Sequence, residues 1–163
     1  MSDTGGLERT AKASVLDRLI DLAPREGADP PTTRKASVDA HRAAVLRDVE
    51  WLLNARRSIV PVPDALPELA HSVFAYGLPD LTSIGTDSPE ARVGLVRKVK
   101  RTIETFEPRL KDVRVHIDEA EEGERQLHFT IEAMLQMEPE PERIVFDTVM
   151  KLSSGDFSVS SAP

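Results

Sequence analysis

The 163-residue chain is long enough for one domain with a substantial core, and its composition of 40% apolar and 30% charged residues is typical of globular proteins. The formal net charge of −7 argues against non-specific nucleic-acid binding as the main task, and the absence of cysteine excludes disulfides, zinc–thiolate sites and thiol nucleophiles. No apolar run approaches the roughly 20 residues of a membrane span, and the N-terminus lacks a signal-peptide core, so we expect a cytoplasmic protein without direct membrane insertion.

Residues 1–36 are predicted to form a flexible N-terminal segment that carries one short helix at 14–21. Ser14 is a candidate N-cap, and apolar residues follow it at helical spacing. Residues 23–36 mix Pro, Gly and charge, which is typical of a mobile linker. Because so short a helix cannot bury its own apolar face, it either packs on the domain or binds a partner. The long linker favours the partner.

The first long helix is predicted at 37–57, with Ser37 as its N-cap and Arg56 and Arg57 at its negative C-terminal end. The predicted buried stripe consists of Val38, Val45, Val49 and Leu52, with Leu53 beside it. His41 lies at the edge of this stripe and is interpreted as a structural residue. Trp51 lies off the stripe, where it either covers a neighbouring loop or anchors a partner.

A proline-rich connection at 58–90 is rich enough in apolar residues to be packed, with one short helical turn that ends at Gly77. The second long helix is predicted at 88–106, because Ser88 followed by Pro89 is a strong start signal. Its predicted buried stripe consists of Val93, Val96, Val99, Ile103 and Phe106. Its exposed sides carry an excess of cations, which either form a solvated face or meet an anionic protein partner. These cations are Arg92, Arg97, Lys98, Lys100 and Arg101.

The C-terminal third alternates apolar and polar residues, which predicts strands at 112–118, 126–137, 143–152 and 157–161. The predicted fold class is therefore α+β, with two long helices packed on a three- to four-stranded antiparallel sheet whose strands are C-terminal. The last strand is expected at or near an edge of the sheet. Unpaired backbone groups on such an edge favour the addition of a strand from another chain.

Catalytic motifs are not found: the sequence has no phosphate-binding glycine loop, HExxH or GxSxG, and its four histidines show no metal-ligand spacing. Phage-type lysozymes carry the pattern Glu-x8-Asp-x5-Thr. Glu138 and Asp147 match the first gap, but Ser153 occupies the third position. With 28 acidic residues, one such spacing is expected by chance. We therefore predict no catalytic residues, no cofactor and no metal.

Several segments resemble, in the same order along residues 14–160, the TssE family of type VI secretion system baseplate subunits. This family is related to the contractile-phage wedge proteins often labelled lysozyme-like. The segments are VLDRL (15–19), RDVEWLLNARRS (47–58), AYGLPDLTS (75–83), FEPRL (106–110) and VRVHI (113–117). The resemblance implies a non-enzymatic baseplate wedge domain over residues 37–163. It also implies a C-terminal sheet like the strand-exchanging handshake domain of sheath proteins.

The resemblance further implies a set of partners and a location. The family's members sit in a six-fold baseplate, in six copies, beside TssF, TssG and TssK, and are expected to initiate polymerisation of the sheath proteins TssB and TssC by strand exchange. The baseplate is cytoplasmic and docks on the inner-membrane complex. Two alternatives remain: a wedge protein of a phage tail or extracellular contractile particle, and a peptidoglycan-cleaving enzyme. A zymogram without clearing at high protein load would eliminate the enzyme.

The trio Glu107, Pro108 and Arg109 separates the second helix from the first strand and matches the family's Glu-Pro-Arg motif. Glu107 is either a catalytic acid or part of a structural clasp at a docking surface, and we favour the clasp. Pro108 ends the helix, and the two charged side chains that flank it are expected to point to different surroundings. Arg109 is suited to carboxylates, and Glu107 to backbone amides. The other expected interface residues are Leu16, Asp17, Arg18 and Leu19.

Overall fold

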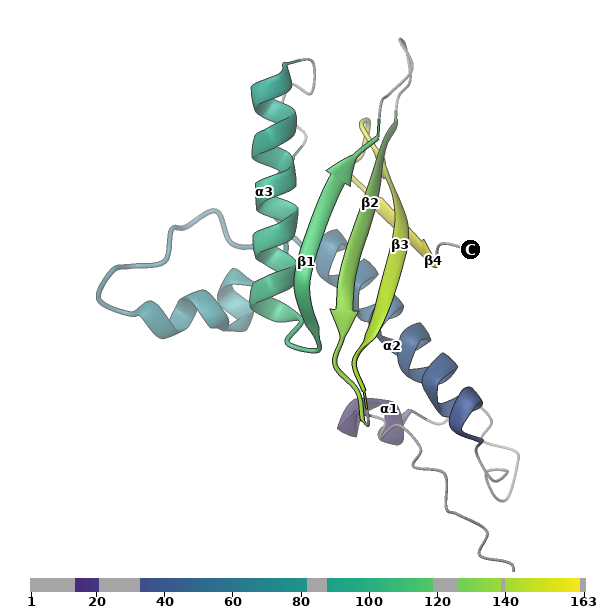
Figure 1. Ribbon diagram of the computed structural model, residues 1–163. Coiled ribbons are helices and arrows are strands. Elements are labelled where there is room, and N and C mark those ends of the chain that lie inside the picture. Colours follow the sequence, from purple (N-terminus) through teal and green to yellow (C-terminus); the bar gives the residue numbers. More distant parts are fainter. Residues whose placement is uncertain (1–13, 21–32, 82–87, 119–125, 139, 162–163) are drawn as a thin grey trace, which may run out of the picture.

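The C-terminal third of the chain forms a four-stranded antiparallel meander in the order β1-β2-β3-β4, with two long helices on one face (Figure 1). The computed structural model describes residues 14–20, 33–81, 88–118, 126–138 and 140–161. The strands are β1 (Leu110–Ile117), β2 (Gln126–Leu135), β3 (Glu142–Lys151) and β4 (Phe157–Ser161). The predicted α+β architecture, with its strands C-terminal, is confirmed.

The first long helix, α2 (Arg34–Asn54), starts three residues before the predicted position. Thr33 is the N-cap: its Oγ1 accepts a hydrogen bond from the backbone N–H of Ala36 at 3.2 Å. Ser37 was the wrong choice of cap, because it is buried inside the helix and donates to the Arg34 carbonyl. The predicted linker at 23–36 therefore overlaps the start of α2, and its residues 23–32 lie outside the described part of the chain.

The second long helix, α3 (Pro89–Phe106), begins where the sequence predicts, since Ser88 Oγ accepts from the N–H of Ala91 at 3.1 Å. Its buried residues are Leu95, Val99 and Ile103, whereas the side chain of Val93 is 49% exposed. The predicted stripe was thus wrong at its N-terminal end. The helix turns Leu95, which the sequence analysis overlooked, toward the core in place of Val93.

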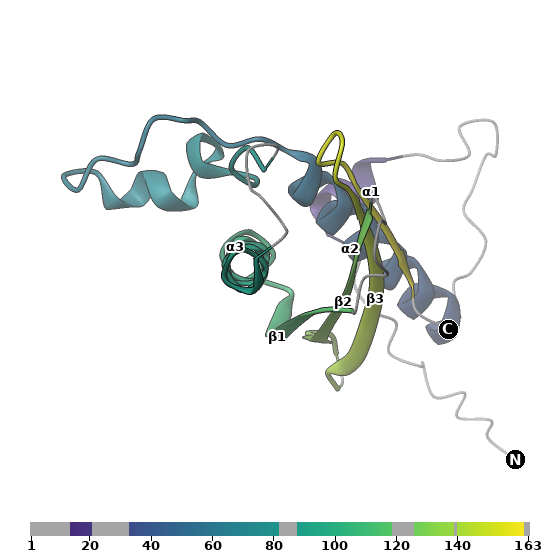
Figure 2. The same cartoon turned by 90° about the horizontal axis from the view of Figure 1, so that it is seen from above.

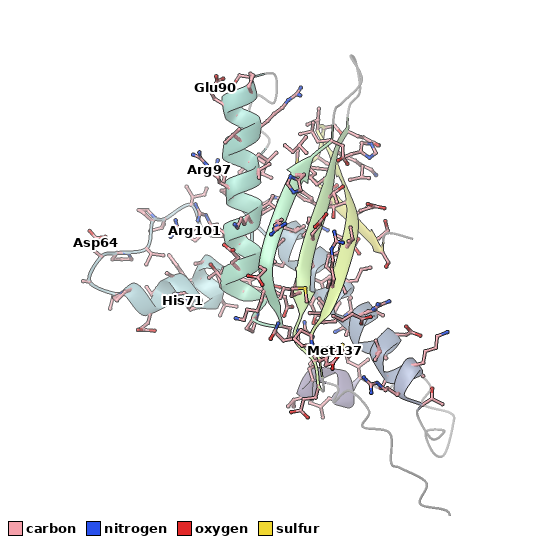
Figure 3. The ribbon with its side chains drawn as sticks, viewed as in Figure 1. Asp64, His71, Glu90, Arg97, Arg101 and Met137 are labelled. Atoms are coloured by element: carbon pink, nitrogen blue, oxygen red, sulfur yellow. The ribbon has the colours of Figure 1, made fainter. Side chains whose placement is uncertain are left out.

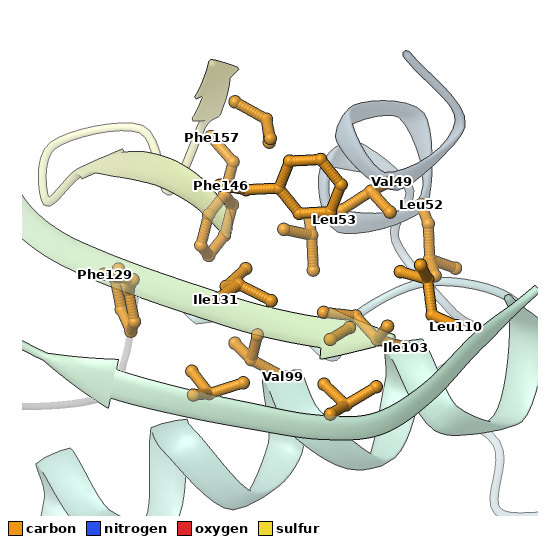
Figure 4. Packing of buried hydrophobic residues seen from close by; sticks show 14 of the residues in the cluster. Val49, Leu52, Leu53, Val99, Ile103, Leu110, Phe129, Ile131, Phe146 and Phe157 are labelled. Atoms are coloured by element: carbon orange, nitrogen blue, oxygen red, sulfur yellow. The ribbon is translucent and has the colours of Figure 1, made fainter. Parts of the chain in front are cut away.

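The core lies between the helices and one face of the sheet (Figure 4). α3 packs against β1, and α2 packs against β4, so that together the two helices cover the sheet from edge to edge. Inward residues alternate along β2 as predicted, and the largest of them, Phe129, contacts Phe157 of β4 with ring centroids 6.0 Å apart. An ion pair between Arg42 and Glu142 also ties α2 to the start of β3.

Residues 58–77, which we call the arm, project beside α3 away from the sheet (Figure 2). The arm contains two 3-10 helices, η1 (Pro67–His71) and η2 (Val73–Ala75). It returns to α2 through a short parallel bridge, in which Leu78 donates to the Ala55 carbonyl at 3.0 Å. The prediction that its apolar residues are packed holds only in part. Tyr76 packs edge-on to Phe106, but Ile59, Val60, Leu66 and Val73 are exposed.

The short N-terminal helix, α1 (Val15–Leu19), forms within the predicted range 14–21, of which residue 21 lies outside the described part. Its apolar side chains are open to solvent: Val15 is 65%, Leu16 51% and Leu19 77% exposed. None of the described helices combines the length and the apolar character needed to cross a membrane.

Candidate docking site

The turn between α3 and β1 is built by the predicted Glu-Pro-Arg trio. Glu107 caps α3 by donating its backbone N–H to the Ile103 carbonyl at 2.8 Å, and its own carbonyl accepts from the N–H of Leu110 at 3.1 Å. Pro108 stands between them, where its ring ends the helix. The chain therefore reverses within three residues, and β1 starts at once. The Arg109 carbonyl then accepts from the N–H of Gln136, which fixes the end of β2 beside this turn.

The side chains of Glu107 and Arg109 bind each other, contrary to the expectation that they would point to different surroundings. Arg109 Nε donates to Glu107 Oε1 at 2.7 Å, and Nη2 donates to Oε2 at 2.6 Å. Nη2 also donates to Oδ2 of Asp48 on α2 at 2.6 Å. The planar guanidinium thus bridges carboxylates from two elements. We call the three residues Asp48, Glu107 and Arg109 the clasp.

The clasp is largely withdrawn from solvent: the Glu107 side chain is 7% exposed, and those of Arg109 and Asp48 are each 21% exposed. The hydrogen bonds to Glu107 are the main reason why the pKa of Arg109 is raised, so Arg109 stays charged. Burial, followed by the charges of Asp48 and Glu107, raises the pKa of the neighbouring Tyr76. The trio is therefore not a plain helix stop with two solvated charges.

Two groups at the clasp have no contact with another described polar group. Pro108 is exposed, and Nη1 of Arg109 donates no hydrogen bond to a described residue. Both oxygens of Glu107 accept from Arg109, which suits a structural carboxylate more than a catalytic acid. Sequence reasoning missed Asp48, because no local signal on α2 distinguishes it from the other acidic residues that lie along that helix.

The acidic pair with lysozyme-like spacing does not face across a cleft. Glu138 is exposed just beyond β2, whereas Asp147 is exposed in the middle of β3. Glu138 lies in the turn that precedes Glu142, the first residue of β3. Asp147 lies five residues farther along β3, and five strand residues span roughly 16 Å. Glycosidase carboxyl groups lie closer than about 10 Å to each other. Among the described residues, no group of three or more His, Asp or Glu side chains could hold a metal ion.

The outer edge of β4 carries a second arrangement that the sequence did not reveal. Asn54, the last residue of α2, donates from Nδ2 to the Phe157 carbonyl and accepts at Oδ1 from the Phe157 N–H, both at 2.8 Å. Its amide thus takes the place of a neighbouring strand at one position. Arg56 reinforces this contact, because Nη2 donates to the Gly155 carbonyl at 2.9 Å.

At Val159, the next outward-facing position, the edge of β4 has no partner among the described residues. Backbone groups that point toward β3 and away from it alternate along an antiparallel strand. The backbone N–H and C=O of Val159 therefore point away from β3, as those of Phe157 do. No hydrogen bond from a described residue reaches the outward groups of Val159. The opposite edge differs, because β1 has a register irregularity between Lys111 and Arg114, with Asp112 at φ +53°. Such a bulge discourages pairing with another strand, so β4 is the edge better suited to strand addition.

The other predicted interface residues lie on α1, separate from the clasp in the sequence. Leu16 and Leu19 are exposed there. The side chains of Asp17 and Arg18 lie outside the described ones. The role of all four in binding a partner stays a prediction.

Comparison with known families gives one result. Residues 39–140 match the sequence model of the family described as baseplate wedge protein gp25. The matched span runs from α2 through β2 and includes all three residues of the clasp. No curated protein matches the chain.

Proposed function

From the premise that the chain belongs to the baseplate wedge protein gp25 family, we propose that it is a TssE-type subunit of a type VI secretion baseplate that initiates sheath polymerisation. The family is structural rather than catalytic, and a wedge protein has baseplate and sheath components as its partners. The finer proposal is that the chain docks beside TssF, TssG and TssK and contacts TssB and TssC. Six copies would then stand in each cytoplasmic baseplate above the inner-membrane complex.

The observation that supports the sheath contact is the backbone of Val159 on the outer edge of β4, whose outward groups bind no described residue. The strand is five residues long and pairs on its inner side with Phe146–Met150 of β3. The Asn54 amide already occupies the outer side at Phe157. In this proposal, an added sheath strand pairs at Val159 and not at Phe157.

Replacing Val159 by proline tests this strand addition. The Val159 N–H points away from β3, so proline removes an outward donor and none of the ladder bonds to β3. We expect Val159→Pro to abolish fluorescent sheath foci in cells. Val159→Ala is the matched control, since it loses the same buried side chain but keeps the N–H, and we expect it to retain foci. Normal foci with a folded Val159→Pro protein would refute the proposal.

The clasp is proposed to be the point at which this subunit docks in the wedge. Its support is the exposed Pro108 and the unused Nη1 group of Arg109, both beside the start of β1. We expect Arg109→Ala and Glu107→Ala to abolish baseplate assembly while the purified chain still folds. Co-purification of each variant with the TssF and TssG proteins measures this. Normal assembly in either variant would contradict it.

A phage tail or extracellular contractile particle is the alternative setting for the same wedge role. The neighbouring genes separate the two, because only a secretion system is encoded beside membrane-complex proteins.

A further inference from the structure

A groove of about 500 Å³ runs between the arm and the C-terminal half of α3. Lys98, Arg101, Thr102 and Thr105 line one wall at helical spacing, so they form one continuous face of α3. Figure 3 shows Arg101 on the side of the helix toward the arm, with His71 on the arm below it. Residues 58–62 of the arm form the opposite wall, and Phe74 and Phe106 contribute to the lining.

The helix wall is cationic without local compensation. Lys98, Arg101 and Arg57 all line the groove, and none of them forms an ion pair with a described residue. This contrasts with Lys100 on the same helix, which pairs with Glu104 at 3.7 Å. The whole chain carries a net charge of −7, so three unpaired cations around one groove are a local exception. Their mutual repulsion would be relieved by carboxylates from outside the chain.

The arm wall is apolar and exposed. Ile59 is 98% exposed and Val60 is 62% exposed, and both line the groove. These two adjacent aliphatic side chains lie beside the cationic wall. Such a groove suits a segment that has acidic residues on one side and aliphatic residues on the other. A nucleic acid would match the cations but would gain nothing from the aliphatic wall.

We propose that this groove docks an acidic amphipathic segment of a partner protein. Its carboxylates lie along Lys98 and Arg101, and its aliphatic side chains cover Ile59 and Val60. The stretch of α3 from Lys98 to Thr105 is roughly 10 Å long. An extended segment of about three to four residues spans that length. The inference is independent of strand addition at β4 and of the clasp.

Fluorescence anisotropy with the full chain tests the inference. The probe is a fluorescein-labelled peptide of about eight residues that alternates Glu and Leu, long enough to overhang both ends of the groove. Two control peptides replace either every Glu by Lys or every Leu by Ser. We expect the Glu–Leu peptide to bind about tenfold more tightly than either control, and this binding to weaken with added salt. Equal binding of the Glu–Leu and Lys–Leu peptides would overturn the proposal.

Variants of the chain localise the site. The double variant Lys98→Glu/Arg101→Glu is expected to lose at least about tenfold in affinity for the Glu–Leu peptide. Arg97→Glu is the matched control, because Arg97 is exposed on the same helix but does not line the groove. It should change affinity by less than about twofold. All three side chains are exposed, so folding should be unaffected. Equal losses in the double variant and the control would overturn the proposal.

A photo-crosslinking residue at Ile59 identifies the occupant in assembled complexes. We expect mass spectrometry to find it attached to a protein segment that contains both acidic and aliphatic residues. Attachment to a basic segment or to nucleic acid would refute the proposed chemistry. We expect the Lys98→Glu/Arg101→Glu variant to lose this crosslink. This result tests the groove alone, because it does not depend on whether sheath foci form through β4.

Discussion

Arg109 joins two carboxylates that come from separate elements, Glu107 at the end of α3 and Asp48 on α2. Removing its guanidinium would strand Glu107, whose side chain is only 7% exposed. Arg109→Ala is therefore expected to lower the free energy of unfolding by about 3 kcal/mol, the lower end for a broken buried ion pair, because Arg109 itself is 21% exposed. Urea unfolding followed by the fluorescence of Trp51, the single tryptophan, measures this loss.

Arg143→Ala is the matched control for that experiment. Arg143 pairs with Glu132 at 2.9 Å, but its side chain is 66% exposed. The expected loss is below about 1 kcal/mol, because exposed pairs contribute little. Similar losses in the two variants would show that burial does not distinguish the clasp from an ordinary surface pair. Since small domains are stable by roughly 5–15 kcal/mol, both variants should remain folded.

Tyr76 provides a pH-dependent test of the same neighbourhood. Burial and the charges of Asp48 and Glu107 raise its pKa above the ordinary value of 10.0. The folded chain therefore favours the neutral phenol. This contribution to stability is complete below pH 10 and is lost as the pH rises through the higher folded pKa. We expect the phenolate absorbance of this single tyrosine to titrate at higher pH in the native chain than in urea. Identical midpoints would contradict this.

At the scale of elements, Asn54 fastens the end of α2 to the outer edge of β4. Asn54→Ala leaves the Phe157 N–H and carbonyl without these partners, and we expect a loss of about 1–2 kcal/mol. Native-state hydrogen exchange should accelerate at the Phe157 amide. Asn54→Asp retains an acceptor for that amide but has no donor for the carbonyl, so it should protect the amide better than alanine does. Unchanged exchange in Asn54→Ala would refute this role.

Gly77 lets the end of the arm approach the backbone of Ala55 closely, just after α2. It adopts φ +97°, and a Cβ there would lie 2.4 Å from the Ala55 carbonyl oxygen. Gly77→Ala should therefore destabilise the chain by at least about 2 kcal/mol. Gly94→Ala is the control with the opposite sign: nothing lies within 4 Å of its Cβ, and alanine in a helix should add about 0.5–1 kcal/mol. Thermal unfolding should separate the two variants clearly.

The elements were predictable where the signal is local. Period-two alternation located every strand to within about two residues, and Ser88 with Pro89 located the start of α3. Thr33 and Ser37 are both plausible caps, and the sequence has no feature that ranks one above the other. Leu95 was missed because an apolar stripe drawn through Val93 fits the helical period almost as well.

The site was predictable only in part, because its contacts join distant parts of the chain. The Glu-Pro-Arg trio was found from the helix–strand junction and the family resemblance. Asp48 lies 61 residues from Arg109, and Asn54 lies 103 residues from Phe157. Pairings at such separations leave no local pattern in one sequence. They appear only once the packing of α2 against β4 and of α3 against β1 has brought the elements together.

Over the whole molecule, three of the contacts described above involve the C-terminal half of α2 and the residue that follows it. Asp48 binds the α3–β1 turn, Asn54 binds β4, and Ala55 accepts a hydrogen bond from Leu78 at the end of the arm. One helix thus holds the clasp, the outer edge of β4 and the groove-forming arm in a fixed relation. A subunit that must meet several partners at once benefits from such rigidity, because less conformational freedom is lost on assembly.

The short helix α1 contributes little to this framework, and its role is separable by mutation. Leu16 and Leu19 are 51% and 77% exposed, so replacing both by serine should leave the melting temperature of the chain almost unchanged. If α1 binds a wedge partner, the same double variant should abolish co-purification with the wedge proteins, as should deletion of residues 1–36. Co-purification that survives the serine variant would show that α1 is not a docking element. A large fall in melting temperature would instead show that its leucines stabilise this chain's own domain.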